Sequence, residues 1–416
     1  MFRALAAIAL ASLLVAPTAR SAAPEAKASH HDLFVWTGDY AKQGFDFLAV
    51  IDADPASSTY GRVITSTVTD QQSVRPHHTE YTMPSSGMLF ANDHDAGRSF
   101  IFDVRDPLHP AIVASFGDLA GFSHPHSYLR LPNGNVLATF QHVHHDMQGM
   151  QGMQGMQGGE MGKSGGLVEI DDHGVAARSA STADPAFPEA LLMPYGLVVI
   201  PGIDRVVSTN SSMHDDDIFS GASYQVWRLS DLKLLKTAYF DIGANRYAHI
   251  GPQEPRLAPD GSVLVQTLSC GLERITEVAT ASPRSQLVYT FPGNWCGPPT
   301  IIGHYFVESV PAIHGFIVLD IAAPKRPVEV SRLTLPDNFR PHWTGWDPQT
   351  RRLVVTPSSR EGNRVYLLRL DEATGALTVD NQFRDLDGKP GVNFNHRTWP
   401  HGWTGDAWPH GAVFSR

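Results

Sequence analysis

Several features that mark common classes of enzyme are missing from this sequence. It contains no glycine-rich phosphate-binding loop, no Gly-x-Ser-x-Gly nucleophile turn and no zinc-protease His-Glu-x-x-His motif. Helical periodicity is nearly absent after residue 30, whereas 36 glycines and 30 prolines provide for many tight turns between short strands. These absences favour an all-β chain, and any chemistry in it would have to come from a bound metal.

Long apolar runs are scarce as well, and the run at the N-terminus is too short to span a membrane. A basic start at Arg3 is followed by the apolar residues 4–17, and Ala19-Arg20-Ser21 offers small residues ahead of a cleavage site. We predict a secretory signal peptide over residues 1–21 and a flexible segment over 22–30, with a retained membrane anchor as the alternative. The mature protein would be periplasmic or secreted and would have no membrane span.

Basic residues and cysteines are also few. The chain has 32 Lys and Arg against 42 Asp and Glu, and loss of the signal peptide with Arg3 and Arg20 would take the formal net charge from −10 to −12. An acidic balance of this size argues against nucleic acid or anionic lipid as a partner. The only two cysteines are Cys270 and Cys296. An oxidising compartment favours a disulfide between them, as a structural staple rather than a redox catalyst.

What the sequence does contain is a short phrase that recurs about once per 40 to 70 residues, a proline followed by a side chain that can point to a shared centre. The phrases are Pro76-His77-His78, Pro125-His126, Pro194-Tyr195, Pro255-Arg256, Pro298-Pro299, Pro341-His342 and Pro400-His401. Repeats of this length with short strands predict a β-propeller. Seven phrases predict seven blades in one domain over residues 31–416. Each phrase would start an innermost strand, and the stretch from Trp399 onward would complete the first blade.

Four of the seven phrases carry histidine, so imidazoles are expected to converge on the central channel. The candidates are His77, His78, His126 and His342, with His401 in the closing stretch and His124, His396 and His410 nearby. Imidazoles without carboxylates or thiolates suit copper or zinc. The alternative is that each Pro-His is a structural turn in a wet channel. Strand alternation would send His77 and His78 to opposite faces, so both can bind one metal only if the strand start is irregular.

One insertion interrupts the repeats, and we predict a Met/His-rich loop over residues 141–165. Repeated Met-Gln-Gly cannot build a core. The candidate copper-capturing set is His142, His144, His145, Met147, Met150, Met153, Met156 and Met161. Thioether sulfur favours Cu(I), so the loop and the imidazoles together favour copper over zinc. The alternative is a low-complexity expansion without function.

Several motifs resemble the selenium-binding protein and methanethiol oxidase family. The stretch 44–55 is similar to that family's opening blade, and His77-His78 resembles its paired histidines. His126, ahead of residues 131–136, resembles the next histidine segment. Ile313-His314-Gly315 is similar to a late blade, and the stretch 405–410 resembles the final histidine motif.

This resemblance implies a seven-bladed propeller and an exported copper enzyme. The implied copper ligands are His77, His78, His126 and His410. For the fourth ligand the repeat pattern puts forward His342 and His401 instead, and His396 is a further candidate. The family has a cysteine-containing segment after the paired histidines, whereas this chain has no thiol in residues 82–87.

We interpret the sequence as a copper-dependent oxidase of a small sulfur-containing molecule, with dioxygen as the acceptor. The missing thiol and the Met/His-rich loop favour a second hypothesis, a non-enzymatic copper-binding or copper-delivery protein with a copper donor or acceptor as partner. A third hypothesis is a protein-interaction propeller with no metal role.

Overall fold

The computed structural model describes residues 31–72, 75–143, 164–188, 190–213, 218–241, 251–336, 339–359 and 362–416. The predicted signal peptide and the segment 22–30 lie outside the described residues, and so do residues 144–163 of the Met/His-rich segment. Among the described residues, no helix is long and apolar enough to cross a membrane.

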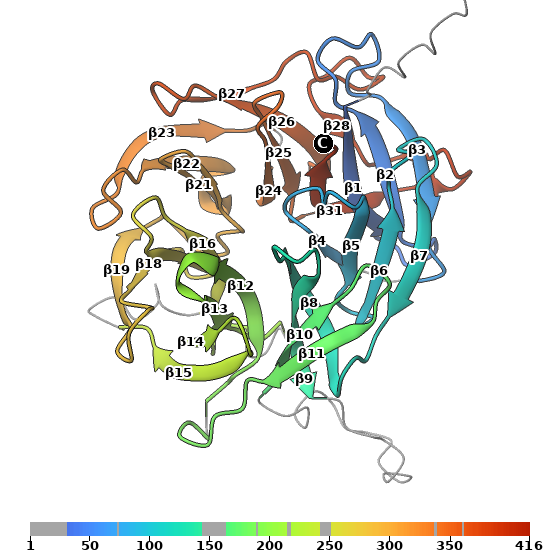
Figure 1. Ribbon diagram of the computed structural model, residues 1–416. Helices are drawn as coiled ribbons and strands as arrows, with labels where there is room; N and C mark the ends of the chain where they lie inside the picture. Colours follow the sequence, from blue (N-terminus) through green and yellow to red (C-terminus); the bar gives the residue numbers. More distant parts are fainter. Residues whose placement is uncertain are drawn as a thin grey trace, which may run out of the picture. The chain divides into compact units, whose positions relative to one another are not determined.

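Seven antiparallel sheets contain nearly all of the strands, and we number them as blades 1 to 7 (Figure 1). Blade 1 consists of β31 (Ala407–Phe414), β1 (Asp32–Asp39), β2 (Phe47–Asp52) and β3 (Val63–Val68). Blade 2 consists of β4 (Pro76–Thr79), β5 (Met88–Asp93), β6 (Arg98–Asp103) and β7 (Ala111–Phe116). Blade 3 consists of β8 (Phe122–Arg130), β9 (Val136–Val143), β10 (Gly166–Ile170) and β11 (Ala176–Ser181). Blade 4 consists of β12 (Pro194–Ile200), β13 (Arg205–Asn210), β14 (Ser223–Arg228) and β15 (Lys233–Tyr239).

The remaining three blades follow the same order from the innermost strand outward. Blade 5 consists of β16 (Pro252–Leu257), β17 (Val263–Thr267), β18 (Gly271–Thr276) and β19 (Arg284–Thr290). Blade 6 consists of β20 (Thr300–Ile302), β21 (Tyr305–Val310), β22 (Gly315–Asp320) and β23 (Val328–Thr334). Blade 7 consists of β24 (Pro341–Asp347), β25 (Arg352–Pro357), β26 (Arg364–Leu370) and β27 (Leu377–Val379), and β28 (Val392–Asn393) also pairs with β26. Outside the blades lie the hairpin of β29 (Arg397–Thr398) and β30 (Thr404–Gly405) and the short 3₁₀ turns η2 (Pro201–Ile203) and η4 (Pro311–Ile313).

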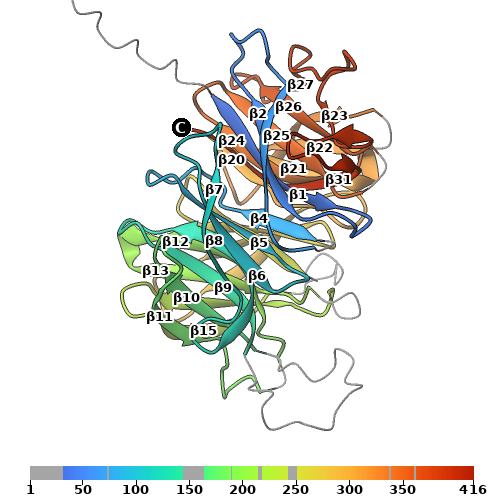
Figure 2. The same cartoon turned by 90° about the vertical axis from the view of Figure 1, so that its right-hand side faces the viewer.

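The innermost strands form a closed ring (Figures 1 and 2). Successive innermost strands contact one another from β24 through β31, β4, β8 and β12 to β16, and β20 contacts β24. The gap between β16 and β20 is bridged by a hydrogen bond from Arg256 Nε to the Pro299 carbonyl, at 3.0 Å. β31 pairs with β1, with Leu33 opposite Phe414, so the two ends of the described chain share one sheet. The predicted seven-bladed propeller, closed by N- and C-terminal strands in one blade, is confirmed.

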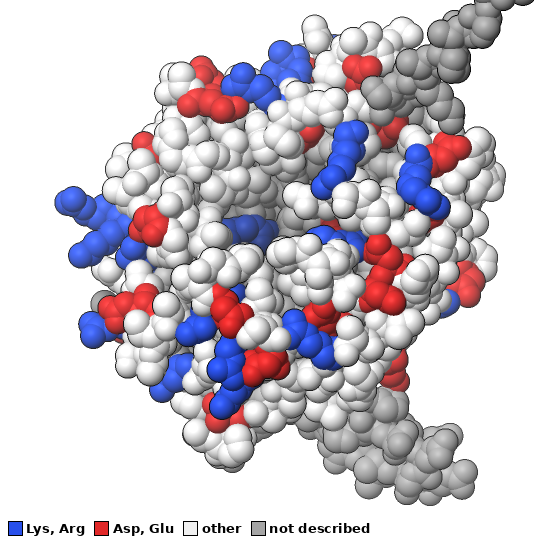
Figure 3. Space-filling model, in the orientation of Figure 1, with Lys and Arg blue, Asp and Glu red and all other residues white. Residues whose placement is uncertain are grey.

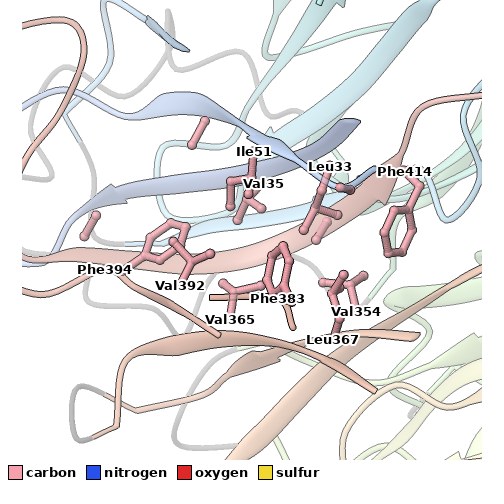
Figure 4. Packing of buried hydrophobic residues seen from close by; sticks show 14 of the residues in the cluster. Leu33, Val35, Ile51, Val354, Val365, Leu367, Phe383, Val392, Phe394 and Phe414 are labelled. Atoms are coloured by element: carbon pink, nitrogen blue, oxygen red, sulfur yellow. The ribbon is translucent and has the colours of Figure 1, made fainter. Parts of the chain in front are cut away.

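Adjacent blades pack face to face through strands that are apolar on both sides. In β1, Leu33 and Val35 pack toward blade 7 and share a buried cluster with Val354 (Figure 4). Phe34 and Trp36, the alternate residues of the same strand, join the buried cluster with blade 2. Because successive strand residues point to opposite faces, such a strand reads as a nearly continuous apolar run. Each large side chain buried in this way contributes about 1.5–3 kcal/mol to folding.

Six of the seven innermost strands carry a β-bulge directly after a proline. In each, two residues of the innermost strand lie opposite one of the second strand, which leaves one residue extra. We call the two residues after the proline the first and second bulge residues. The first bulge residues are His77, His126, Tyr195, Gln253, His342 and His410, and the second are His78, Ser127, Gly196, Glu254, Trp343 and Gly411.

Two of the predicted repeat phrases are thereby corrected. In blade 5 the bulge follows Pro252, which pairs with Thr267, and not Pro255. In the closing blade it follows Pro409, which pairs with Thr37, whereas Pro400 lies between the two strands of the β29–β30 hairpin. The physical reason is register: a proline ends the hydrogen-bond ladder only where its missing N–H would have faced the second strand. A Pro-His pair in a turn satisfies the sequence pattern without meeting that condition.

Candidate metal centre

Five imidazoles from four neighbouring blades meet at the axis of the ring. Between ring centres, His77 lies 4.0 Å from His78, 4.8 Å from His126 and 4.3 Å from His410, and His342 lies 4.5 Å from His410. Two groups have ligand atoms that all lie within 4.8 Å of one another: His77 with His78 and His126, and His77 with His342 and His410. Both groups could hold a metal ion, and they share His77.

The bulge explains how the adjacent His77 and His78 reach the same centre. The pairing of β4 with β5 shifts between Pro76 and Thr79, so these two histidines escape the alternation of a regular strand. Their rings stack at an interplanar angle of 14°. The irregular strand start that the sequence requires for a shared site is therefore present.

Four nitrogens of the cluster are buried and make no hydrogen bond: His77 Nδ1, His78 Nε2, His126 Nε2 and His410 Nδ1. Leaving a buried polar atom unpaired costs about 1–3 kcal/mol. These four atoms are spread over the two groups that share His77, and an ion bound in either group would satisfy the unpaired nitrogens of that group. The residues present therefore fit a metal, and these four are the ligands that the family resemblance implies.

Hydrogen bonds behind the rings fix the orientation of two of these imidazoles. His126 Nδ1 donates to the Tyr195 carbonyl at 2.8 Å, which leaves its Nε2 directed inward. His78 Nδ1 lies 3.2 Å from the Ser127 hydroxyl, which in turn donates to the buried carboxylate of Glu254. Partners of this kind set the tautomer and the angle of metal-binding histidines. Sequence reasoning missed Ser127 and Glu254, whose only signal was their place two residues after the blade's proline.

A second set of positioning contacts holds the bulges themselves. A hydroxyl on the second strand of one blade donates to the carbonyl of the first bulge residue of the next blade. The pairs are Thr139 to Tyr195 (2.8 Å), Thr209 to Gln253 (2.6 Å), Ser309 to His342 (2.8 Å) and Thr356 to His410 (2.8 Å). Sequence reasoning did not find these contacts, although a Thr or Ser recurs at this position of the second strands. They tie each bulge to its neighbouring blade.

The cluster is neutral near pH 7. Burial, followed by the neighbouring imidazoles, lowers the pKa of His77, His78 and His410 well below the usual value, and burial does the same for His126. Burial and the nearby Arg75 lower the pKa of His342 to about 4. Neutral imidazole is the form that binds a metal.

A cavity of about 590 Å³ opens onto one side of the cluster. Five of the six first bulge residues line it, His126 being the exception, together with the cations Arg75 and Arg340 and the indoles of Trp295 and Trp408. Separately from this lining, the face drawn in Figure 3 is hollowed at the centre of the ring, and basic side chains lie within that hollow. The cavity gives a small molecule access to the His77, His342 and His410 side of the cluster.

Two predicted candidates are not brought to the cluster. His401 Nδ1 lies 2.7 Å from the Ser66 hydroxyl on β3, and its ring packs against Phe47. His396 is exposed and pairs with Asp406 at 3.0 Å. Of the copper-capturing set, His142 is described in β9, whereas His144, His145 and the five methionines lie outside the described residues, so their role stays a prediction.

The predicted disulfide is confirmed. Cys270 and Cys296 are bonded and fully buried, and their Cα atoms are 5.1 Å apart. Cys270 precedes β18 in blade 5, and Cys296 precedes β20 in blade 6. The bond therefore ties two neighbouring blades together.

Fold and site together define a seven-bladed β-propeller with a polyhistidine centre. No family model matches the chain. It is 33% identical over 122 residues to a methanethiol oxidase from a Hyphomicrobium species, a match that spans 28% of each protein. By structure, a hypothetical selenium-binding protein from Sulfolobus tokodaii matches with a TM-score of 0.68, 15% identity and 94% of each chain covered. A periplasmic gluconolactonase from Pseudomonas aeruginosa matches with a TM-score of 0.58 and 13% identity, over 93% of this chain and 99% of its own.

The two structural matches concern the fold, because their sequence identities are low. The partial sequence match, together with the fold shared with the selenium-binding protein, confirms the predicted resemblance to the selenium-binding protein and methanethiol oxidase family.

Proposed function

We propose that this protein is an exported copper-dependent oxidase of a small sulfur-containing molecule, with the histidine cluster as its copper site and dioxygen as the acceptor. The observation that carries the proposal is a buried cluster of histidines beside a cavity, in which four imidazole nitrogens are unpaired and two groups of three could each hold an ion. When bound there, copper would supply a centre that changes oxidation state by one electron.

Copper is preferred to zinc because of two independent features. Imidazole suits either metal, but the methionines of the segment 147–161 offer thioether sulfur, which selects Cu(I). The resemblance to the methanethiol oxidase family points the same way. Export is supported by the disulfide, since such bonds persist in oxidising compartments.

The side chains at this site have different roles in the proposed function. His77, His78, His126 and His410 would hold the ion, and Ser127 with Glu254 would keep His78 in its binding orientation. His342, neutral and on the cavity side, is placed to accept a hydrogen bond from a thiol. Trp343, stacked on Tyr81 at 4.2 Å, packs beside His78 and excludes water from that side of the cluster.

The substrate is expected to be a small thiol or sulfide, with methanethiol itself a poor one. A volume of about 590 Å³ is that of an ordinary small-molecule site. The segment 82–87 contributes no thiol, and its Met83 is buried in the apolar cluster between blades 1 and 2. A reaction that needs a cysteine thiol from this segment cannot obtain one in this protein.

The test follows oxygen uptake and peroxide release with a panel of small thiols and sulfides. It compares copper-loaded protein, metal-free protein and the His126→Ala variant. Turnover that depends on copper loading supports the oxidase, and strong methanethiol turnover would show that no cysteine is needed. Absence of turnover across the whole panel would overturn the oxidase.

A second candidate is a copper-delivery protein. The observation that favours it is the place of the Met/His-rich segment, which follows β9 in the same blade that carries His126. Loaded protein that passes copper readily to a chelator or an acceptor protein, without oxygen uptake, would favour delivery.

A further inference from the structure

Three histidines outside the cluster lie in series between blade 3 and the centre. His142 is the penultimate residue of β9, His124 lies in β8, and His94 directly follows β5. The ring centres are 5.0 Å apart for His142 and His124 and 6.3 Å for His124 and His94. We call these three residues the histidine track.

The inner end of the track reaches the proposed metal ligands. The ring centre of His94 lies 5.9 Å from that of His126 and 5.8 Å from that of His77. An imidazole nitrogen binds a metal at about 2.0 Å, so the ring centre lies about 3 Å from the ion and two rings opposed across one ion are about 6 Å apart. Every step of the track therefore matches the separation of two imidazoles that share an ion.

The backbone of His124, the middle residue of the track, adopts an unusual conformation. His124 has a φ of 57°, in the left-handed region that costs about 1–2 kcal/mol for a residue with a Cβ. Gly97 lies against it, and a Cβ at that position would come within 3.3 Å of the His124 ring. Strain of this kind persists where the surrounding structure holds it, and it is concentrated at functional sites.

Of the three track residues, the middle one is the most accessible to solvent. His124 is partly exposed, whereas His142 and His94 are 1% and 5% exposed. Among the described residues, groups of three close ligand atoms occur only in the central cluster. Each step of the track offers two imidazoles and the centre offers three, so a metal is held more tightly in the centre than on the track.

We propose that His142, His124 and His94 form a transfer track that conducts a copper ion, by successive ligand exchange, into the central cluster. No electron or proton changes hands in this step, because each bond to one imidazole is replaced by a bond to the next. The inference rests on the proposed copper site and adds the route by which that site is filled. The Met/His-rich segment, which lies outside the described residues, is not needed for it.

The experiment measures copper uptake by metal-free, full-length protein from a limiting, chelator-buffered Cu(I) supply, and separately the copper content after long incubation with excess copper. The variants are His142→Gln, His124→Asn and His94→Gln, with His173→Ala as the control because His173 lies in an exposed turn of blade 3. Asn is used at position 124 because it tolerates a positive φ.

Each track variant should slow uptake by about tenfold or more, the scale on which loss of one imidazole's contribution alters metal binding. The final copper content should equal that of the unaltered protein. Because the stations act in series, the His142→Gln, His124→Asn double variant should be no slower than the slower single variant.

The outcomes separate the two proposals. Uptake at the unaltered rate in all three variants would overturn the track and leave the central site standing. A lower final copper content in properly folded variants would also overturn the track, by making its members ligands of the central ion. If the unaltered protein binds no copper, the proposed function fails and the track fails with it.

Discussion

The two arcs of the ring share one backbone design but carry different chemistry. Blades 7, 1, 2 and 3 form the histidine arc, whose first bulge residues are all imidazoles. Blades 4, 5 and 6 form the opposite arc, where the side chains at the axis include Tyr195, Gln253 and the buried pair of Glu254 and Arg256. The unpaired imidazole nitrogens belong to the histidine arc, and the Glu254–Arg256 ion pair belongs to the opposite arc.

This difference shows that the arcs depend on each other. Glu254, from the opposite arc, accepts a hydrogen bond from Ser127, and Ser127 contacts both His78 and His126. Arg256 lies 4.0 Å over the ring of Tyr81, which stacks on Trp343 beside His78. One arc would supply the metal ligands, and the other fixes how they point.

The largest expected effect comes from breaking the histidine arc. His126→Ala should abolish copper retention, because it removes one of the three imidazoles of the His77, His78 and His126 group and opens a gap in a rigid site. Metal analysis of purified protein should find about one copper per unaltered chain and almost none in the variant. His173→Ala, in an exposed turn, is the control, and equal retention in both variants would contradict the assignment of the site.

Removing the disulfide of the opposite arc should lower the stability of the protein without lowering its copper content. Replacing Cys270 and Cys296 together by serine should lower the free energy of unfolding by about 3 kcal/mol, because the crosslink restricts the unfolded chain. Urea unfolding measures the loss. Copper content should stay unchanged, and a parallel loss of copper would show that the staple also shapes the centre.

The link between the arcs is tested at Glu254. Glu254→Gln keeps the size of the side chain but replaces the carboxylate that Ser127 contacts, so copper affinity should fall about 10–100-fold. Competition with a chelator of known affinity measures the change. Glu169→Gln is the matched control, because Glu169 is a buried carboxylate paired with Arg178 away from the cluster. Equal affinities in the two variants would show that the arcs are independent.

The smallest effect concerns a carboxyl of the opposite arc that has no hydrogen-bond partner. Burial raises the pKa of Glu308 well above its usual value, although Arg256 opposes this. The folded state then keeps a proton that the unfolded state releases above about pH 4.3, so the free energy of unfolding falls as pH rises past that value and levels off above the folded-state pKa. Glu308→Gln has no such proton and should flatten the decline in urea unfolding measured between pH 5 and pH 8. Parallel curves for both proteins would refute this.

Much of this protein follows from its sequence, for physical reasons. Apolar strand runs such as those of β1 and β2, separated by turns, require burial on both faces, and a closed ring of sheets packed face to face provides it. His77, His78 and His126 were identified because they follow prolines at matching intervals, and proline restricts where a strand can begin. The cysteines were paired because so few were present in a chain with a predicted export signal.

The register of the strands, by contrast, was decided by the tertiary structure. The same Pro-His dipeptide occurs at Pro400-His401 and at Pro409-His410. Only the pairing of β31 with β1 shows that the second dipeptide reaches the axis. Ser127 and Glu254 became visible as partners only once neighbouring blades brought them together. A bulge shifts every side chain after it to the other face, and whether a strand bulges depends on its partner strand rather than on its own residues. The sequence by itself thus determined the blades and most of the imidazoles, while contacts between blades determined which nitrogens remain unpaired at the centre.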